Sequence, residues 1–275
     1  MKKRRLKIRF ALFVALVSIL GLLLILFAIF CRGENYNEIE ITTESTTVEE
    51  TTTLPPEIEE STTEEESSTE PETTTKPPVK WESYNPIDVL NSEEWALTLI
   101  NKKYPLGKAY SPTLAPVVDS SLITADTRVS DAYKLMYADA LAQGVVLTPY
   151  SGYCSYSRQQ SNYDNKVQAF ILQGMTEDEA KANAEKRIEP AGCSENGAGL
   201  SVDIISASAG FASTNEYKWL VENAHKYGFV LRYPEDKTDI TGMIYQPWHW
   251  RYVGIDVASE MKSSNLCLEE YLNAK

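Results

Sequence analysis

The sequence predicts an α+β domain with a small, mostly antiparallel sheet packed with helices, and it places this domain in residues 81–275. Segments with apolar residues at helical spacing come first, and short strand-like runs follow around the polar motifs. About 195 residues suffice for one domain with a sizeable core, and nearly all Trp and Tyr residues lie here. No internal repeat is visible.

Four segments are predicted to be helices. Residues 126–143 repeat apolar side chains at helical spacing, and a second helix is expected from about residue 159 to 172. Residues 176–187 open with a capping-box pattern, in which Thr176 is followed three residues later by Glu179. A helix over residues 216–227 is closed by Gly228. Strands are predicted at residues 145–150, 201–205, 229–233 and 250–253.

Residues 10–31 form an uncharged, mostly apolar run between Arg9 and Arg32. As a helix, a run of this length spans about 33 Å, enough to cross a hydrocarbon core of about 30 Å. The alternative is a cleaved signal peptide, but the run is long for one and Ala28-Ile29-Phe30 offers no small-x-small cleavage site. We therefore expect a single-pass transmembrane helix, with the basic residues 1–9 in the cytoplasm and the C-terminal domain outside the cell.

Residues 32–80 are rich in Thr, Glu, Ser and Pro, and residues 33–80 hold fourteen Glu against two Lys. Such a segment buries too little apolar surface to offset its chain entropy, so we expect a disordered stalk. The stalk would hold the following domain away from the membrane, toward the cell wall. Residues 81–275 carry 17 basic against 25 acidic side chains. An acidic domain without a basic run argues against a nucleic-acid partner.

Two motifs carry the chemistry of this domain. The first is Ser194-Glu195-Asn196-Gly197-Ala198-Gly199-Leu200-Ser201-Val202-Asp203, and the second is Tyr245-Gln246-Pro247-Trp248-His249-Trp250-Arg251-Tyr252. Both resemble signatures of the VanY-type D-alanyl-D-alanine carboxypeptidases of peptidase family M15. The resemblance covers most of residues 90–257 and includes Ser151-Gly152-Tyr153-Cys154-Ser155-Tyr156. It implies a Hedgehog/DD-peptidase-like fold and a zinc enzyme that removes the terminal D-Ala from peptidoglycan stem peptides.

Three positions that the resemblance makes catalytic hold other residues here. The family's zinc ligands fall at Asn196, Asp203 and His249, and the family has His at the first of these. An amide oxygen is a poor zinc ligand, so we expect zinc affinity to fall severely and no zinc to be held. Gln246 stands where the family has its Glu base, and an amide does not take a proton from water. Cys154 stands where the family carries an Arg that is expected to stabilise negative charge on the substrate.

The cysteines leave two interpretations open. Cys154 and Cys193 each lie in a motif expected to line one pocket, and in an extracellular domain we expect a disulfide between them. The alternative is a rewired zinc site of Cys154, Cys193, Asp203 and His249, which leaves no position for water. Cys31 and Cys267 have no evident partner.

The binding surface is predicted from residues that match the family pattern: Tyr153, Ser155, Ser194, Trp248 and Tyr252. These side chains could shape a cleft for a stem peptide, although Trp248 and Tyr252 are explained equally well as core aromatics.

Two further residues have a functional and a structural interpretation. Arg158 could replace the missing guanidinium or could decorate the surface of a helix. His225 lies away from both motifs and is interpreted as a structural helix residue.

The sequence thus predicts a membrane-tethered, extracellular VanY-like domain that has lost zinc-dependent hydrolysis. Its expected partner is a peptidoglycan stem peptide or a wall-associated protein. Two alternatives stay open. One is an active zinc D,D-carboxypeptidase with an unusual metal site, and the other is a structural or protein-interaction module without affinity for the wall.

Overall fold

The structure is a computed structural model that describes residues 79–273, all of which belong to one compact unit formed by residues 72–275. The predicted anchor and nearly all of the predicted stalk lie outside the described residues. In the part that is described, no helix is long and apolar enough to cross a membrane.

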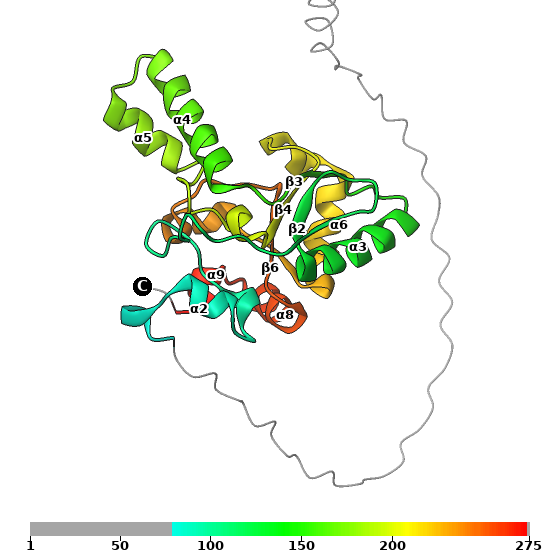
Figure 1. Ribbon diagram of the computed structural model, residues 1–275. Coiled ribbons are helices and arrows are strands. Elements are labelled where there is room, and N and C mark those ends of the chain that lie inside the picture. Colours follow the sequence, from blue (N-terminus) through cyan, green and yellow to red (C-terminus); the bar gives the residue numbers. More distant parts are fainter. Residues whose placement is uncertain (1–78, 274–275) are drawn as a thin grey trace, which may run out of the picture. The chain divides into compact units, whose positions relative to one another are not determined.

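The predicted α+β class is confirmed, and its centre is a four-stranded antiparallel sheet in the order β3-β4-β6-β5 (Figure 1). Its strands are β3 (Pro149–Ser151), β4 (Ser201–Ile204), β5 (Phe229–Leu231) and β6 (His249–Tyr252). All four predicted strands are present. The first begins at Pro149 rather than at residue 145, because residues 145–148 are not part of the sheet. A separate antiparallel pair, β1 (Leu114–Pro116) and β2 (Thr124–Asp126), was not predicted.

Helices surround the sheet, and the four predicted ones are present with shifted ends. The structure has α2 (Pro86–Leu90), α3 (Thr127–Ala142), α4 (Tyr156–Leu172), α5 (Glu177–Glu185), α6 (Asn215–Asn223), α7 (Thr238–Thr241), α8 (Ile255–Ser264) and α9 (Leu268–Tyr271). Short 3-10 turns are η1 (Trp81–Ser83), η2 (Trp95–Leu97), η3 (Glu195–Ala198), η4 (Ala209–Ser213), η5 (Ala224–Tyr227) and η6 (Glu235–Lys237).

Helix ends follow their capping residues. The α4 helix begins three residues earlier than predicted, because Ser155 is its N-cap and its side chain accepts a hydrogen bond from the Arg158 backbone. The predicted capping box between Thr176 and Glu179 is present at the start of α5. The segment 216–227 divides into α6 and η5, and Gly228 ends it in a left-handed conformation, as expected.

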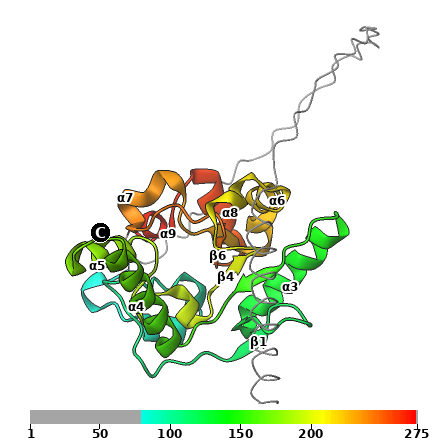
Figure 2. The same ribbon diagram turned by 90° about the horizontal axis from the view of Figure 1, so that it is seen from above.

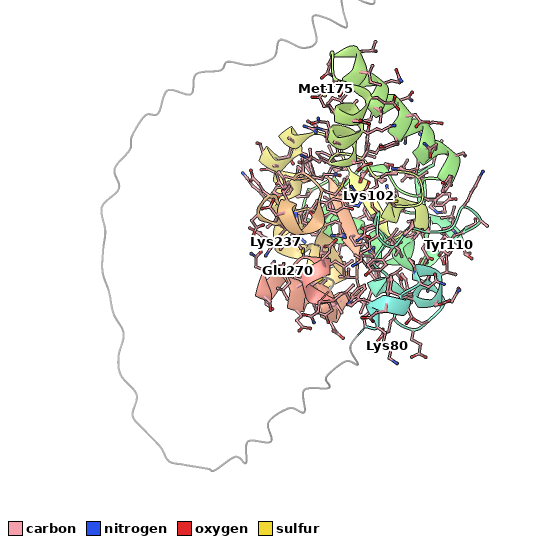
Figure 3. The ribbon with its side chains drawn as sticks, turned by 90° about the vertical axis from the view of Figure 1, so that its left-hand side faces the viewer. Lys80, Lys102, Tyr110, Met175, Lys237 and Glu270 are labelled. Carbon is pink, nitrogen blue, oxygen red and sulfur yellow. The ribbon has the colours of Figure 1, made fainter. Side chains whose placement is uncertain are left out.

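The main core lies between the sheet and the helices α3 and α6, which lie on one side of the domain (Figures 1 and 2). It includes Tyr133 and Met136 of α3, Val202 of β4, Leu220 of α6 and Trp250 of β6. The α4–α5 hairpin projects from the opposite side and has a small core of its own. Figure 3 places Met175, in the turn of this hairpin, at its outer end.

Gly199 lies between η3 and β4, at a position that accepts only a residue without a side chain. Its φ angle of 70° lies in the left-handed region, and a Cβ there would be 2.6 Å from the backbone nitrogen of Asp126. This close approach fixes η3 against the start of α3, and thereby fixes where Asn196 lies.

A cluster of buried charges lies beneath the two motifs. Arg232 donates to Glu195 at 2.7 Å and forms a two-bond pair with Glu269 at 2.8 and 2.6 Å. The Arg251 guanidinium lies 2.9 Å from the same Glu195 carboxylate. Burial by itself would raise the pKa of Glu195, but the guanidinium groups of Arg232 and Arg251 hold it well below its usual range. Glu195 is therefore ionised and acts as the junction of the cluster.

We predict that Arg232→Met destabilises the domain by about 3–5 kcal/mol, because the buried Glu269 carboxylate loses its two-bond partner and Glu195 keeps only Arg251. Chemical denaturation followed by circular dichroism measures this loss. The control is Lys181→Met, which removes a cation from an exposed pair with Glu177 and should change the unfolding midpoint little. Equal effects of the two substitutions would contradict a structural role for the buried cluster.

Candidate functional site

A cleft of about 710 Å³ opens beside β3, β4 and β6, and both motifs line it. The first motif contributes Ser194 and Asn196 together with Asp203, and the second contributes Gln246 and His249. Another wall comes from α4 and from residues 187–189, which follow α5. Residues of both motifs thus line one cleft.

Asp203 and His249 form the central contact of the cleft. They lie directly opposite each other in the antiparallel register of β4 and β6, so both side chains project from the same face of the sheet. The distance between His249 Nδ1 and Asp203 Oδ1 is 2.7 Å. The Tyr233 ring stacks on the imidazole with ring centroids 5.2 Å apart, and only 5% of His249 is exposed.

The other nitrogen of this imidazole faces a second carboxylate. His249 Nε2 lies 3.7 Å from Glu195 Oε2, which joins the cleft to the buried charge cluster. Burial lowers the pKa of His249, but its contacts with the Asp203 and Glu195 carboxylates outweigh burial and raise the pKa to about 10. The imidazole thus lies buried between two carboxylates, at hydrogen-bond distance from Asp203 and 3.7 Å from Glu195.

Asn196 lies in η3, where the resemblance expects a zinc-binding His. Its side-chain oxygen accepts a hydrogen bond of 2.6 Å from the Ser201 hydroxyl. This neutral oxygen is the atom with which an Asn side chain would bind a cation, and it is a weaker zinc donor than an imidazole nitrogen.

Gln246 is buried at the cleft wall and has a partner of its own. Its side-chain nitrogen donates to the backbone oxygen of Arg187 at 3.4 Å. Neither end of this amide takes a proton from water, so Gln246 makes a structural contact at the position where the resemblance implies a base.

Glu189 is a carboxyl group in the cleft that the sequence analysis missed. It accepts a hydrogen bond of 2.6 Å from the Tyr233 hydroxyl, whose ring stacks on His249. Burial raises the pKa of the Glu189 carboxyl. The only signal in the sequence is an acidic residue just before the first motif, and the fold is needed to show that it reaches the cleft.

Cys154 lines the cleft next to the first motif. Its backbone nitrogen donates to the Asn196 backbone oxygen at 3.0 Å, which ties the two segments together. Burial raises the pKa of the Cys154 thiol, so the side chain is a neutral group at the position where the resemblance implies a guanidinium. Arg158 also lines the cleft, from the first turn of α4, whereas His225 lies in η5 against Lys262, as expected for a structural residue.

The predicted disulfide is not formed, because Cys154 and Cys193 are both free and buried. The two thiols lie in different surroundings. The nearby charges that act on Cys154 are Arg158 and Asp203, whereas Cys193 experiences Glu189, Lys102 and Glu185. The prediction was wrong because neighbouring positions along a motif do not determine which way each side chain points.

The residues present do not suit a catalytic zinc ion. Such a site needs three strong donors with one open position. The Asp203 carboxylate and the His249 imidazole are hydrogen-bonded to each other, and the amide oxygen of Asn196 accepts a hydrogen bond from the Ser201 hydroxyl. Within residues 79–273, no group of three or more His, Cys, Asp or Glu is arranged to hold a metal ion, so the rewired site that includes the two cysteines is not formed either.

The predicted binding residues divide between cleft and core. Tyr153, Ser194 and Trp248 line the cleft. Ser155 instead caps α4. Tyr252 stacks on Trp95 with centroids 5.5 Å apart, because alternation along β6 turns it to the face opposite His249. The core interpretation therefore holds for Tyr252.

Comparison with known proteins identifies the family. Residues 123–255 match the family model "VanY: D-alanyl-D-alanine carboxypeptidase". The chain is 39% identical over 185 residues to a D-alanyl-D-alanine carboxypeptidase of Enterococcus faecalis, covering 67% of this chain and 68% of that protein. It is 37% identical over 199 residues to the putative carboxypeptidase YodJ of Bacillus subtilis, covering 67% and 70%.

Solved structures agree. The VanY D,D-pentapeptidase of a VanB-type resistance cassette, solved with Zn(II), matches with 41% identity and a TM-score of 0.59, covering 66% of this chain and all of that chain. VanYB in complex with D-alanine-D-alanine matches with 40% identity and a TM-score of 0.59, covering 66% and 99%. The chain belongs to the VanY D-alanyl-D-alanine carboxypeptidase family.

Proposed function

We propose that this domain binds peptidoglycan stem peptides at the cell wall and does not hydrolyse them by the zinc mechanism of its family. The observation that carries this proposal is the donor set of the cleft. Three positions correspond to the family's zinc ligands. At one of them, the amide oxygen of Asn196 accepts a hydrogen bond from Ser201. The side chains at the other two, Asp203 and His249, are hydrogen-bonded to each other. No carboxylate stands at Gln246 to activate water.

Binding is supported by what remains of the cleft. Its volume of about 710 Å³ suits a short peptide, and Tyr153, Ser194 and Trp248 still line it. The related VanYB was solved with D-alanine-D-alanine. The related carboxypeptidase LdcB, 32% identical with a TM-score of 0.55, was described for its recognition of peptidoglycan.

The proposed location, outside the cell and tethered to the membrane, rests on two features of the sequence. Residues 10–31 would anchor the chain in the membrane, and the acidic segment after them would extend the domain toward the wall.

We predict less than one zinc per ten chains after the purified full chain is equilibrated with zinc and dialysed. D-Ala release from a peptide ending in D-Ala-D-Ala should not exceed the rate without protein. Metal analysis by mass spectrometry and a D-Ala assay measure the two quantities. Stoichiometric zinc together with turnover would show an active carboxypeptidase with an unusual metal site.

We predict that Asn196→His, Gln246→Glu and Cys154→Arg together restore zinc binding. The first change supplies the missing nitrogen ligand, the second a base and the third a cation for the substrate. The matched control carries Asn196→Ala with the same two other changes and should bind no zinc. A folded triple variant that holds no metal would mean that the roles are assigned to the wrong positions.

The anchor has a separate test. The full chain should sediment with membranes and resist a carbonate wash, because a spanning helix is released only by detergent. A chain that lacks residues 1–31 should stay in the supernatant. Release of the full chain by carbonate would contradict the predicted anchor.

A further inference from the structure

A groove of about 340 Å³ lies outside the cleft, and the two share no described residue. It forms where the start of the described chain meets its end. Val79 and Tyr84 come from the first described residues, Leu97 is the last residue of η2, and Leu272 follows α9. Ligand pockets range from roughly 300 to 1,000 Å³, so this groove suits a short segment.

The walls of the groove include apolar side chains that the domain covers only in part. Val79, Tyr84, Val89 and Leu97 line the groove and are half-buried. They adjoin a core cluster to which Leu272 belongs and against which Tyr84 and Leu97 pack. A segment that covered these side chains would remove apolar surface from water, which is favourable.

The Tyr84 ring is held in place by the domain itself. Its hydroxyl donates to the Leu99 backbone oxygen at 3.2 Å and accepts from the Leu99 backbone nitrogen at 2.6 Å. Trp81 and Tyr104 pack against the ring, with ring centroids 5.0 and 4.8 Å away. Because this aromatic wall is already ordered, a segment that packs on it loses little free energy to ordering the wall.

The sequence changes character shortly before Val79. All fourteen Glu of residues 33–80 lie at or before Glu72, whereas both Lys of this range come after it. The run Thr73-Thr74-Thr75-Lys76-Pro77-Pro78 is therefore cationic and Pro-rich, where the rest of the predicted stalk is acidic. A segment that serves only as a spacer does not require such a change at its end.

The groove carries the charge that fits this run. Asp88, in the first turn of α2, and Glu94 both line it. Complementary charges on two surfaces favour their contact and fix its register. Lys76 is the cation that the preceding segment would bring to these carboxylates.

Covalent continuity brings the run to the groove. Val79 lines the groove and successive Cα atoms are about 3.8 Å apart, so Pro77 and Pro78 start within about 8 Å of a lining residue. Each proline fixes its own φ angle and restricts the residue before it to extended conformations. The sequence Lys76-Pro77-Pro78 thus favours polyproline II, the conformation in which Pro-rich segments dock into aromatic-lined grooves.

We propose that residues 76–78 occupy this groove. The two proline rings pack against Tyr84 and Leu97, and the ammonium group of the lysine lies beside Asp88 and Glu94. The end of the predicted stalk is then a fixed part of the domain, and the tether leaves the domain from one defined place.

A fixed exit has a consequence for the direction in which the domain faces. Figure 3 places Lys80 at the end of the domain opposite Met175, which lies at the tip of the α4–α5 hairpin. With its exit fixed at the Lys80 end, the tether holds the hairpin end of the domain away from the predicted anchor.

The first test replaces the prolines in the full chain, kept in detergent, and follows thermal unfolding of the domain by Trp fluorescence. Pro77→Gly/Pro78→Gly should lower the unfolding midpoint by about 2–4 °C, because a docked segment orders on folding and glycine makes this ordering more costly. The control Pro55→Gly/Pro56→Gly changes the other adjacent proline pair and should leave the midpoint unchanged, since a segment that is disordered in both states does not contribute. Equal midpoints for the two variants overturn the proposal.

The second test detects the contact itself. A carbodiimide joins an ammonium group and a carboxylate that touch, and an amide bond forms with loss of water. Mass spectrometry of the treated full chain should find such a bond from Lys76 to Asp88 or Glu94. The variant Pro77→Gly/Pro78→Gly should lose most of this product, whereas a tether that only collides with the groove would keep it.

The outcomes decide which segment occupies the groove. An amide bond within one chain, together with a midpoint shift confined to the Pro77 and Pro78 pair, supports the proposal. Amide bonds found only between two chains assign the groove to a second copy and overturn it. Absence of a bond to Lys76, or a yield that the glycine pair leaves unchanged, overturns it as well. None of these results depends on what the cleft binds, so the proposed function stands or falls separately.

Discussion

The contact between Asp203 and His249 is the constraint on which the rest of the site depends. The register of β4 and β6 places the two side chains opposite each other, and their distance of 2.7 Å leaves the imidazole nitrogen bonded to a carboxylate. The third position that the resemblance makes a ligand holds the Asn196 amide, whose oxygen accepts a hydrogen bond from Ser201. The register of β4 and β6 therefore decides which side chains meet at the centre of the cleft.

Asn196, Gln246 and Cys154 each make a contact of their own in the wall of the cleft. The Asn196 oxygen bonds Ser201, the Gln246 amide bonds the Arg187 backbone, and Cys154 is a small buried thiol. Buried polar groups without partners are costly, and these amides have partners. Beneath them, the cluster around Glu195 and Arg232 ties the first motif to β6 and α9 through charges that do not take part in zinc chemistry.

The sequence was sufficient for the elements with strong local signals and for the motifs. The helical period of α3 and the capping box at Thr176 led to correct predictions of helices, and the two motifs led to the correct family. The errors concern the direction of side chains. The Cys154–Cys193 disulfide and the placement of Tyr252 in the cleft failed because strand alternation and loop geometry decide which way a residue faces. Glu189 belongs to no motif, and only the fold brings it to the cleft.

Binding and hydrolysis place different demands on such a cleft, and this is why one can persist without the other. Hydrolysis needs groups that interact more strongly with the transition state than with the peptide, such as a metal-bound water and a base. Ground-state binding needs only shape and complementary polar groups. Under our proposal the domain keeps the second set of properties without the first, and the cleft of about 710 Å³ lined by Tyr153, Ser194 and Trp248 is the observation that supports this division.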